Sequence, residues 1–336
     1  MGIEGRLFAA LENSDVKAAK KLIAKPSFDV HASMLPPQHQ VGFYPVICAV
    51  AESGLVEVAK CVLEKGANVD ALVGCNGMSA LYIACQEGFH DMAALLIAHK
   101  ANVNLLTTDQ VPSSPLHIAS QYGHKRVVKL LLRNGANIDQ CQTKENVSSL
   151  MLAVRCMHPD VAMLLIENGA DVFIRNTNGI TALIIASNRG LEPVVRALLA
   201  KGADPLQEDY IHGCSAIDYA TTAGRKEIIA LFKTHIAEKN SQGNSESDKG
   251  SMSDGNVSGS GRSSVLKQMA ALQINLYESP LQNHEIAGGS TLIKEKKYKC
   301  CSYGPCGKTE KEHGSRLSKC DRCRCVRYCS VECQRS

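Results

Sequence analysis

The chain has 336 residues, a formal net charge of +4 and 45% hydrophobic residues, a balance that excludes a wholly disordered protein. Trp is absent and aromatic residues make up only 4%, so any core must consist mostly of Leu, Ala, Val and Ile. No apolar run reaches the roughly 18 to 20 residues that span a bilayer, which excludes an ordinary membrane-spanning helix and a membrane partner.

The first predicted elements lie between Ile3 and Val30. Leu7–Leu11 predicts one short helix and Val16–Ile23 a second. Phe28–Val30 then leads out of this pair, and the following loop is lengthened around two prolines. We interpret this stretch as a degenerate first copy of a unit that recurs further along the chain.

Two landmarks recur through the next part of the chain, at steps of 33 to 35 residues. The first, where a short helix is expected to end, falls at Gly54, Gly88, Gly123, Met157, Gly190 and Gly224. The second, where a second helix is expected to end, falls at Gly66, Lys100, Gly135, Gly169 and Gly202. Because both landmarks keep the same phase, they indicate stacked helix pairs that bury their apolar faces against one another.

The clearest unit begins with a helix over Leu116–Gln121 and turns at Gly123, where a left-handed conformation costs little. A second helix follows, with Val127, Leu130 and Leu131 at i, i+3 and i+4 spacing on one face. An extended hairpin then leads to the next unit.

This unit resembles the ankyrin repeat, whose T-P-L-H-x-A signature is matched best by Ser114–Ala119. Weaker copies begin at Ser79, Thr181 and Ser215. The resemblance implies a mainly α fold, an ankyrin-repeat solenoid of about seven repeats over residues 3–236. It also implies a surface that binds proteins, and we expect a monomer.

Three residues of the repeats need their own interpretation. Met157 and Lys100 replace the expected glycines, so we expect strained or reshaped turns there, at about 1 kcal/mol each. His117 is interpreted as a structural residue that bonds the turn backbone. Four repeat cysteines are interpreted as small hydrophobic residues: Cys48, Cys61, Cys85 and Cys156. We find no nucleophile–base pair, phosphate loop or metalloprotease motif, so no enzymatic activity is predicted.

A change in composition marks the next segment, residues 237–296, which is rich in Ser and Gly and is predicted to be a flexible linker. Within it, residues 265–276 contain spaced apolar side chains. They predict a short amphipathic helix that either docks on the repeats or a partner, or forms only transiently.

Eight of the 15 cysteines lie in the last 37 residues. Cys320 and Cys323 have the C-x2-C spacing of a metal knuckle, and the other pairs are Cys301 with Cys306 and Cys329 with Cys333. The first residues lack the apolar stretch of a signal peptide, so we expect an intracellular protein, in the cytoplasm, the nucleus or both, with reduced thiols. Soft thiolates at these spacings favour Zn²⁺.

The string from Cys320 to Gln334 closely resembles the MYND-type zinc finger, which binds two zinc ions in an interleaved arrangement. By position, the first ion would be held by Cys301, Cys306, Cys329 and Cys333. Cys320 and Cys323 would begin the second site, which the family completes with a His and a Cys further on. Because the chain stops at Ser336, we expect a finger over residues 297–336 that is truncated at its C-terminus and lacks half of this second site. His313 and Cys325 are candidate substitutes outside the family pattern, and Cys300 is interpreted as a bystander.

Together these resemblances predict a protein–protein interaction adaptor with two arms, repeats that bind proteins and a finger that binds short proline-containing peptides. One alternative is a transcriptional or chromatin regulator that contacts nucleic acid through the basic end, since Lys294–Ser336 holds twelve Lys/Arg and five Asp/Glu, a local charge of +7. Only three aromatic residues lie among these cations, Tyr298, Tyr303 and Tyr328, so nucleic acid is not the expected partner. A second alternative is part of a SET–MYND methyltransferase, for which no stretch has the required length and pattern.

Overall fold

The computed structural model describes residues 2–34, 43–74, 76–142 and 144–243, and the short pairs 318–319 and 327–328. The helices are α1 (Ile3–Glu12), α2 (Val16–Ile23), α3 (Val46–Ser53), α4 (Val56–Glu64), α5 (Ala80–Glu87), α6 (His90–Ala98), α7 (Pro115–Gln121), α8 (Lys125–Arg133), α9 (Ser149–Arg155), α10 (Pro159–Glu167), α11 (Ala182–Arg189), α12 (Glu192–Ala200), α13 (Ala216–Thr222) and α14 (Lys226–Gly243). The strands are β1 (Cys141–Gln142), β2 (Val147–Ser148), β3 (Ser318–Lys319) and β4 (Arg327–Tyr328).

The chain divides into two compact units, Met1–Gly77 with Asn275–Ser336, and Met78–Ile274. In the first unit α1 packs against α2 and α3, and α4 packs against both α2 and α3. The degenerate first repeat is therefore a real helix pair, and its second helix has the predicted bounds of Val16–Ile23. Leu7 and Ile23, at most 1% exposed, form the centre of this pair.

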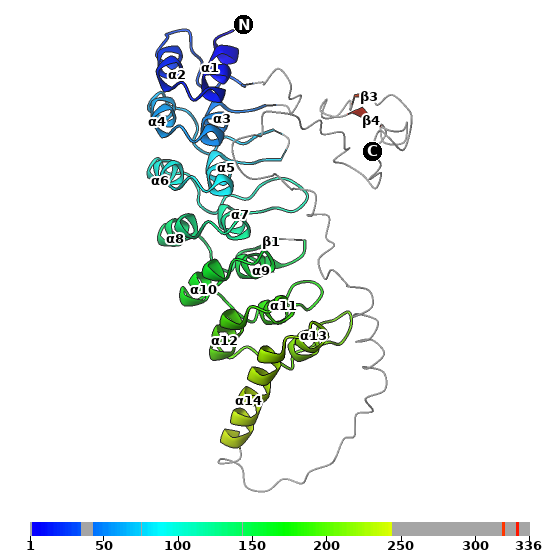
Figure 1. Cartoon of the computed structure of the whole chain (residues 1–336). Helices are drawn as coiled ribbons and strands as arrows, with labels where there is room; N and C mark the ends of the chain where they lie inside the picture. Colours follow the sequence, from blue (N-terminus) through cyan, green and yellow to red (C-terminus); the bar gives the residue numbers. More distant parts are fainter. Residues whose placement is uncertain are drawn as a thin grey trace. The chain divides into compact units, whose positions relative to one another are not determined.

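In the second unit the helices form two rows (Figure 1). The odd-numbered helices α5 to α13 contact one another in sequence, and the even-numbered helices α6 to α14 form a parallel row behind them. Each odd helix also packs against the even helix that follows it. The loops between pairs project from the odd-numbered row (Figure 1). With the first unit this makes seven helix pairs in the described residues, as predicted.

The odd-numbered helices of this unit are short because both of their ends are defined by sequence. Each begins after a Ser or Thr whose side chain accepts a hydrogen bond from the backbone N–H three residues later. These N-caps are Ser79, Ser114, Ser148, Thr181 and Ser215. Neighbours on three sides bury six consecutive residues in α7, α9 and α11, which explains why Ala and Ser are frequent there.

The even-numbered helices bury only one face. In α8, Val127, Val128 and Leu131 are buried, whereas Lys125 and Lys129 are exposed. Such an amphipathic helix is stabilised mainly by packing of its apolar face, at about 1.5–3 kcal/mol for each large aliphatic side chain.

The two predicted glycine replacements keep the backbone conformation of the glycines. Lys100 has φ 70° and Met157 has φ 62°, both in the left-handed region. The repeat geometry therefore tolerates the strain at these turns rather than being reshaped.

One boundary differs from the prediction. We expected the repeats to end at residue 236, but α14 continues to Gly243 and packs on α12 and α13. In the repeats, only β1 and β2 form a strand pair among the described loops, with Cys141 opposite Ser148. The rest of the predicted linker, the helix predicted over 265–276 and most of the predicted finger over 297–336 lie outside the described residues.

Candidate protein-interaction surface

The loops between repeats are hydrogen-bonded to the helix pairs, and His117 provides the clearest example of such bonds. The backbone N–H of Ser114 donates to its Nδ1 over 3.0 Å, so we assign the ring proton to Nε2, which lies 2.7 Å from the carbonyl of Gln140 in the next loop. Burial lowers the pKa of His117 from 6.5 to about 4. The neutral ring therefore holds both bonds at pH 7, which confirms the structural interpretation.

A second set of histidines joins successive repeats. Nε2 of His124 lies 2.8 Å from the carbonyl of Gln86, and Nε2 of His158 lies 3.0 Å from that of Gln121. The role of these two histidines was not predicted from the sequence. Their spacing of 34 residues, each directly before an even-numbered helix, was the signal that would have identified them.

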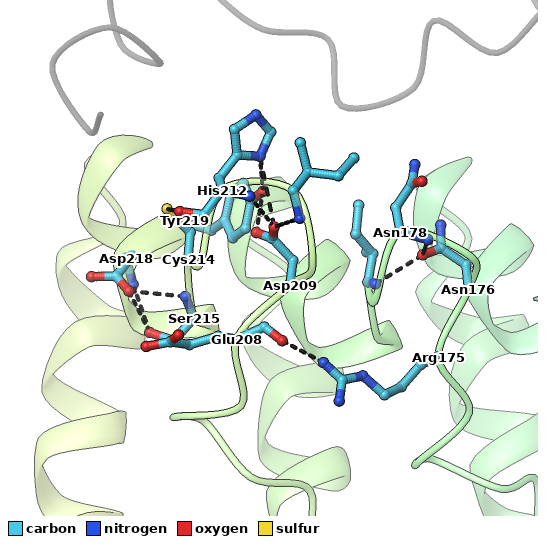
Figure 2. Close-up of polar contacts among 12 residues, drawn as sticks. Arg175, Asn176, Asn178, Glu208, Asp209, His212, Cys214, Ser215, Asp218 and Tyr219 are labelled. Carbon is cyan, nitrogen blue, oxygen red and sulfur yellow. Dashed lines mark hydrogen bonds and ion pairs between the residues drawn. The ribbon is translucent and has the colours of Figure 1, made fainter. Parts of the chain in front are cut away.

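The last loop, residues 204–214, is organised around the buried carboxylate of Asp209 (Figure 2). It accepts hydrogen bonds from the backbone N–H of Ile211 at 2.8 Å and of His212 at 2.6 Å. The hydroxyl of Tyr219, on α13, donates to the same carboxylate over 2.9 Å. Three donors satisfy this buried carboxylate and hold the loop in one conformation.

The last repeat differs from the signature at the residue equivalent to His117. Asp218 caps α13 by accepting from the N–H and the hydroxyl of Ser215, at 2.9 and 2.7 Å. These bonds between Asp218 and Ser215 (Figure 2) correspond to the bonds of His117 with Ser114.

The last two loops are also joined to each other. The guanidinium of Arg175 donates to the carbonyl of Glu208 and, over 3.3 Å, to that of Gly179. Its carbon Cζ lies 4.3 Å from the ring centroid of Tyr210, a cation–π contact. The N–H of Tyr210 donates to the carbonyl of Asn178 over 2.9 Å. The two loops therefore form one ordered surface (Figure 2).

This surface presents apolar side chains to solvent. Tyr210 is 65% exposed and Ile211 is 58% exposed, although the backbone of both is hydrogen-bonded. Of the six large apolar side chains that the described residues leave exposed, four lie in these two loops: Phe173, Leu206, Tyr210 and Ile211. Concentrated exposure of this kind marks a binding surface more often than scattered exposure does.

The predicted zinc ligands are not placed by the structure. Cys301, Cys306, Cys320, Cys323, Cys329 and Cys333 all lie outside the described residues. Near them, β3 and β4 pair antiparallel, with Ser318 opposite Tyr328 and Lys319 opposite Arg327. Within the part of the chain that is described, no group of three or more His, Cys, Asp or Glu residues is arranged to hold a metal ion.

The six cysteines of the repeats that the structure describes carry free thiols: Cys48, Cys61, Cys85, Cys141, Cys156 and Cys214. Burial raises the pKa of Cys48 and Cys85 well above the usual value, and burial with Asp209 and Asp218 raises that of Cys214 to about 11. These thiols are therefore protonated and poor nucleophiles at pH 7.

No described helix is both long and apolar enough to cross a bilayer.

Comparison with known proteins identifies the repeat. The family model for ankyrin repeats (3 copies) matches residues 7–107, 106–176 and 150–243. The crystal structure of the human ASB11 ankyrin repeat domain superposes with a TM-score of 0.58 at 26% identity, over 67% of this chain and 96% of that domain.

Similarity to curated proteins is confined to parts of their length. XBAT34 of Arabidopsis thaliana is 30% identical over 146 residues, which is 43% of this chain and 37% of that protein. Mouse Rabankyrin-5 is 28% identical over 139 residues, or 41% of this chain and 11% of that protein. The chain thus matches well under half of these relatives.

Proposed function

Because the chain belongs to the ankyrin-repeat family, we propose that it acts as an adaptor that binds partner proteins through the loops of its last two repeats. Ankyrin repeats imply protein–protein interaction, and the fold is typically non-enzymatic. The proposal adds where on this chain a partner binds and which side chains contact it.

The single observation that carries the proposal is the exposure of Tyr210 and Ile211 on a loop that is already ordered. Hydrogen bonds to the Asp209 carboxylate hold this loop, one from the N–H of Ile211 within the loop and one from the hydroxyl of Tyr219 on α13. Association loses less conformational entropy when the contacting loop is ordered beforehand, so more of the burial energy of Tyr210 and Ile211 is available for affinity.

The chemistry of the surface indicates the class of partner. Tyr and Arg are the residue types that most often dominate protein interfaces, and here Arg175 stacks on Tyr210. Beside them stand the exposed carboxylates of Asp204 and Glu208. We propose a partner segment with an apolar side chain for the Tyr210–Ile211 pair and a cation for the carboxylates.

Capture of partners by the full chain tests this surface. We expect the double variant Tyr210→Ser/Ile211→Ser to lose proteins that the wild type retains. Met157→Ser is the matched control, because Met157 is 48% exposed but lies outside these loops. Identical sets of retained proteins for the wild type and the double variant would contradict the proposal.

We further propose that the C-terminal cysteines form a zinc-binding finger of the MYND type, a second arm that docks short proline-containing peptides. The donor set supports it, since paired thiolates suit tetrahedral zinc. The β3–β4 pair also supports it, because the segment between its strands contains the C-x2-C spacing of Cys320 and Cys323. When bound, the zinc would supply folding energy to this small module rather than chemistry.

Cys301, Cys306, Cys329 and Cys333 would hold one ion, and Cys320 with Cys323 would begin a second site. We propose that the two arms act together, as a monomer inside the cell, with the finger recruiting one protein and the repeats another. Loss of one set of captured proteins in Tyr210→Ser/Ile211→Ser, and of a different set in Cys329→Ser, is the expected pattern. If both variants lost the same set, the chain would not bridge two partners.

A further inference from the structure

One position of the repeat changes character along the chain. Four residues after each second-helix landmark the side chain is polar in three successive repeats and large and apolar in the next two. The residues are Asp70, Asn104, Asp139, Phe173 and Leu206. Within the second unit, this change falls at Phe173.

In the second unit, the polar residues at this position, Asn104 and Asp139, bond to the following repeat. Oδ1 of Asn104 accepts a hydrogen bond from the backbone N–H of Asn137 over 2.8 Å. Oδ1 of Asp139 accepts one from the N–H of Asp171, also over 2.8 Å. Phe173 has no acceptor to offer, and its ring instead lies beside Gly202, whose Cβ, if it had one, would be 3.8 Å away. The substitution therefore gives up a bond between repeats.

The apolar side chains are not buried in exchange. Phe173 is 58% exposed and Leu206 is 55% exposed. Replacing a bonded polar residue by an exposed apolar one adds little stability inside the stack, and two such residues at the same position of successive repeats indicate a surface that another group covers.

Carboxylates flank both apolar residues. Oδ1 of Asp171 accepts from the N–H of Phe173 over 2.8 Å, and Oδ1 of Asp204 accepts from the N–H of Leu206 over 2.9 Å. Asp171, Asp204 and Asp139 are all exposed. The covering group should therefore be apolar on one face and carry positive charge.

We propose that the covering group is the segment Val265–Leu272 of this same chain. Val265, Met269 and Leu272 have the i, i+4, i+7 spacing of one helix face. From Arg262 to Leu276 the sequence carries two cations and no acidic residue, which complements the carboxylates beside Phe173 and Leu206.

The connecting length favours this occupant. The continuously described part of the repeats ends at Gly243, the last residue of α14, which packs on α12 and α13. Residues 244–264 separate it from Val265, and a Gly/Ser-rich connection of this length has an end-to-end distance of about 25 Å. This distance is on the scale of a few stacked helices, so the tether would hold the segment at an effective concentration of about 1 mM.

Such docking goes beyond the adaptor proposal and does not use Tyr210 or Ile211. In the docked state, residues 265–272 cover Phe173 and Leu206 until a competing basic, amphipathic segment of a partner displaces them. A tethered segment with a dissociation constant of about 0.1 mM would be docked about ten times more often than not.

Photo-crosslinking in the full chain tests the docking. With a photo-reactive benzoylphenylalanine in place of Leu272, we expect crosslinks within one chain to residues 171–175 or 204–208. The variant Phe173→Ser/Leu206→Ser should lower their yield about tenfold, because a dissociation constant about 100-fold weaker takes the docked fraction from about 0.9 to about 0.1, whereas Met157→Ser should leave it unchanged. Met269→Asp should lower it equally, and it lies outside the repeats, so it cannot act by unfolding them.

Three results would overturn the proposal. Crosslinks between two chains would assign the surface to a second copy. Crosslinks to other loops would move the docking site. A yield that Met269→Asp does not change would show that the contact is not made through the apolar face. None of these outcomes bears on partner capture through Tyr210 and Ile211, so the two proposals fail separately.

Discussion

The imidazole of His124 fills the space beside Gly88, where a side chain would otherwise point. A Cβ on Gly88 would lie 2.5 Å from Nδ1 of His124, and Gly88 has φ +74°. Nε2 of the same ring bonds the carbonyl of Gln86 in the preceding repeat at 2.8 Å. Gly88 therefore leaves space for the imidazole of His124 from the next repeat, and this ring hydrogen-bonds back to the repeat that contains Gly88.

We expect Gly88→Ala to lower the free energy of unfolding by about 2–4 kcal/mol, from the left-handed backbone and from displacement of His124. Gly135→Ala is the matched control, because Gly135 has φ +82° but no atom within 4 Å of its Cβ position. Its expected loss is about 1 kcal/mol. Urea denaturation compares the two, and equal losses would show that His124 does not restrict the glycine.

Acid should destabilise the repeats through His117. Its pKa is about 4 in the folded chain and 6.5 as the reference value, so the unfolded chain binds the proton more tightly. Stability from this group is present above pH 6.5 and is lost as the pH falls towards 4, by about 3 kcal/mol.

The control is His117→Gln, which does not titrate. Denaturation between pH 7 and 4 should show a smaller pH slope in this variant than in the wild type. A slope remains, because burial also lowers the pKa of His158. An unchanged slope would contradict the assignment of the acid effect to His117.

Removing the hydroxyl of Tyr219 should loosen the last loop. Tyr219→Phe leaves the buried Asp209 carboxylate without its donor from α13, at a cost of about 1–3 kcal/mol. Hydrogen exchange of residues 209–214 should accelerate, while α7 should exchange as before. Tyr210→Phe is the control, because Tyr210 is largely exposed and its N–H, not its hydroxyl, holds the loop. Equal exchange in both variants would mean that Asp209 does not organise the loop.

Zinc binding can be tested on the full chain by metal analysis. Cys329→Ser should reduce the zinc content by about one ion per chain, because a structural zinc site with three thiolates binds far more weakly. Cys300→Ser should retain the wild-type content, since Cys300 is outside the family pattern. Zinc-free wild-type protein, or an equal loss in both variants, would reject the finger.

The sequence predicted the repeats well because their signals are local. The apolar spacing and the capping residues that define each helix lie close together in the sequence. The helix Val16–Ile23 was therefore predicted to the residue, and the helix predicted over Leu116–Gln121 begins only one residue earlier, at Pro115. The extension of α14 to Gly243 was missed because its last turns are polar and end in glycine, with no apolar face to mark a helix.

The surface was harder to predict than the fold. The pairs Asp209–Tyr219 and Arg175–Tyr210 join residues 10 and 35 positions apart, and nothing periodic links them. Only the exposure of Tyr210 in the folded chain distinguishes it from a core aromatic residue. Such contacts depend on how one loop packs on the next, which one sequence does not reveal.

The most direct test of the adaptor account is a binding titration of the full chain with one purified partner obtained by capture. We predict that Tyr210→Ser/Ile211→Ser raises the dissociation constant about 100-fold, a loss of about 2.7 kcal/mol of binding free energy. Met157→Ser should change the dissociation constant less than about twofold. Equal affinity of the wild type and the double variant, with both folded, would contradict the claim that this pre-ordered loop is the protein-binding surface.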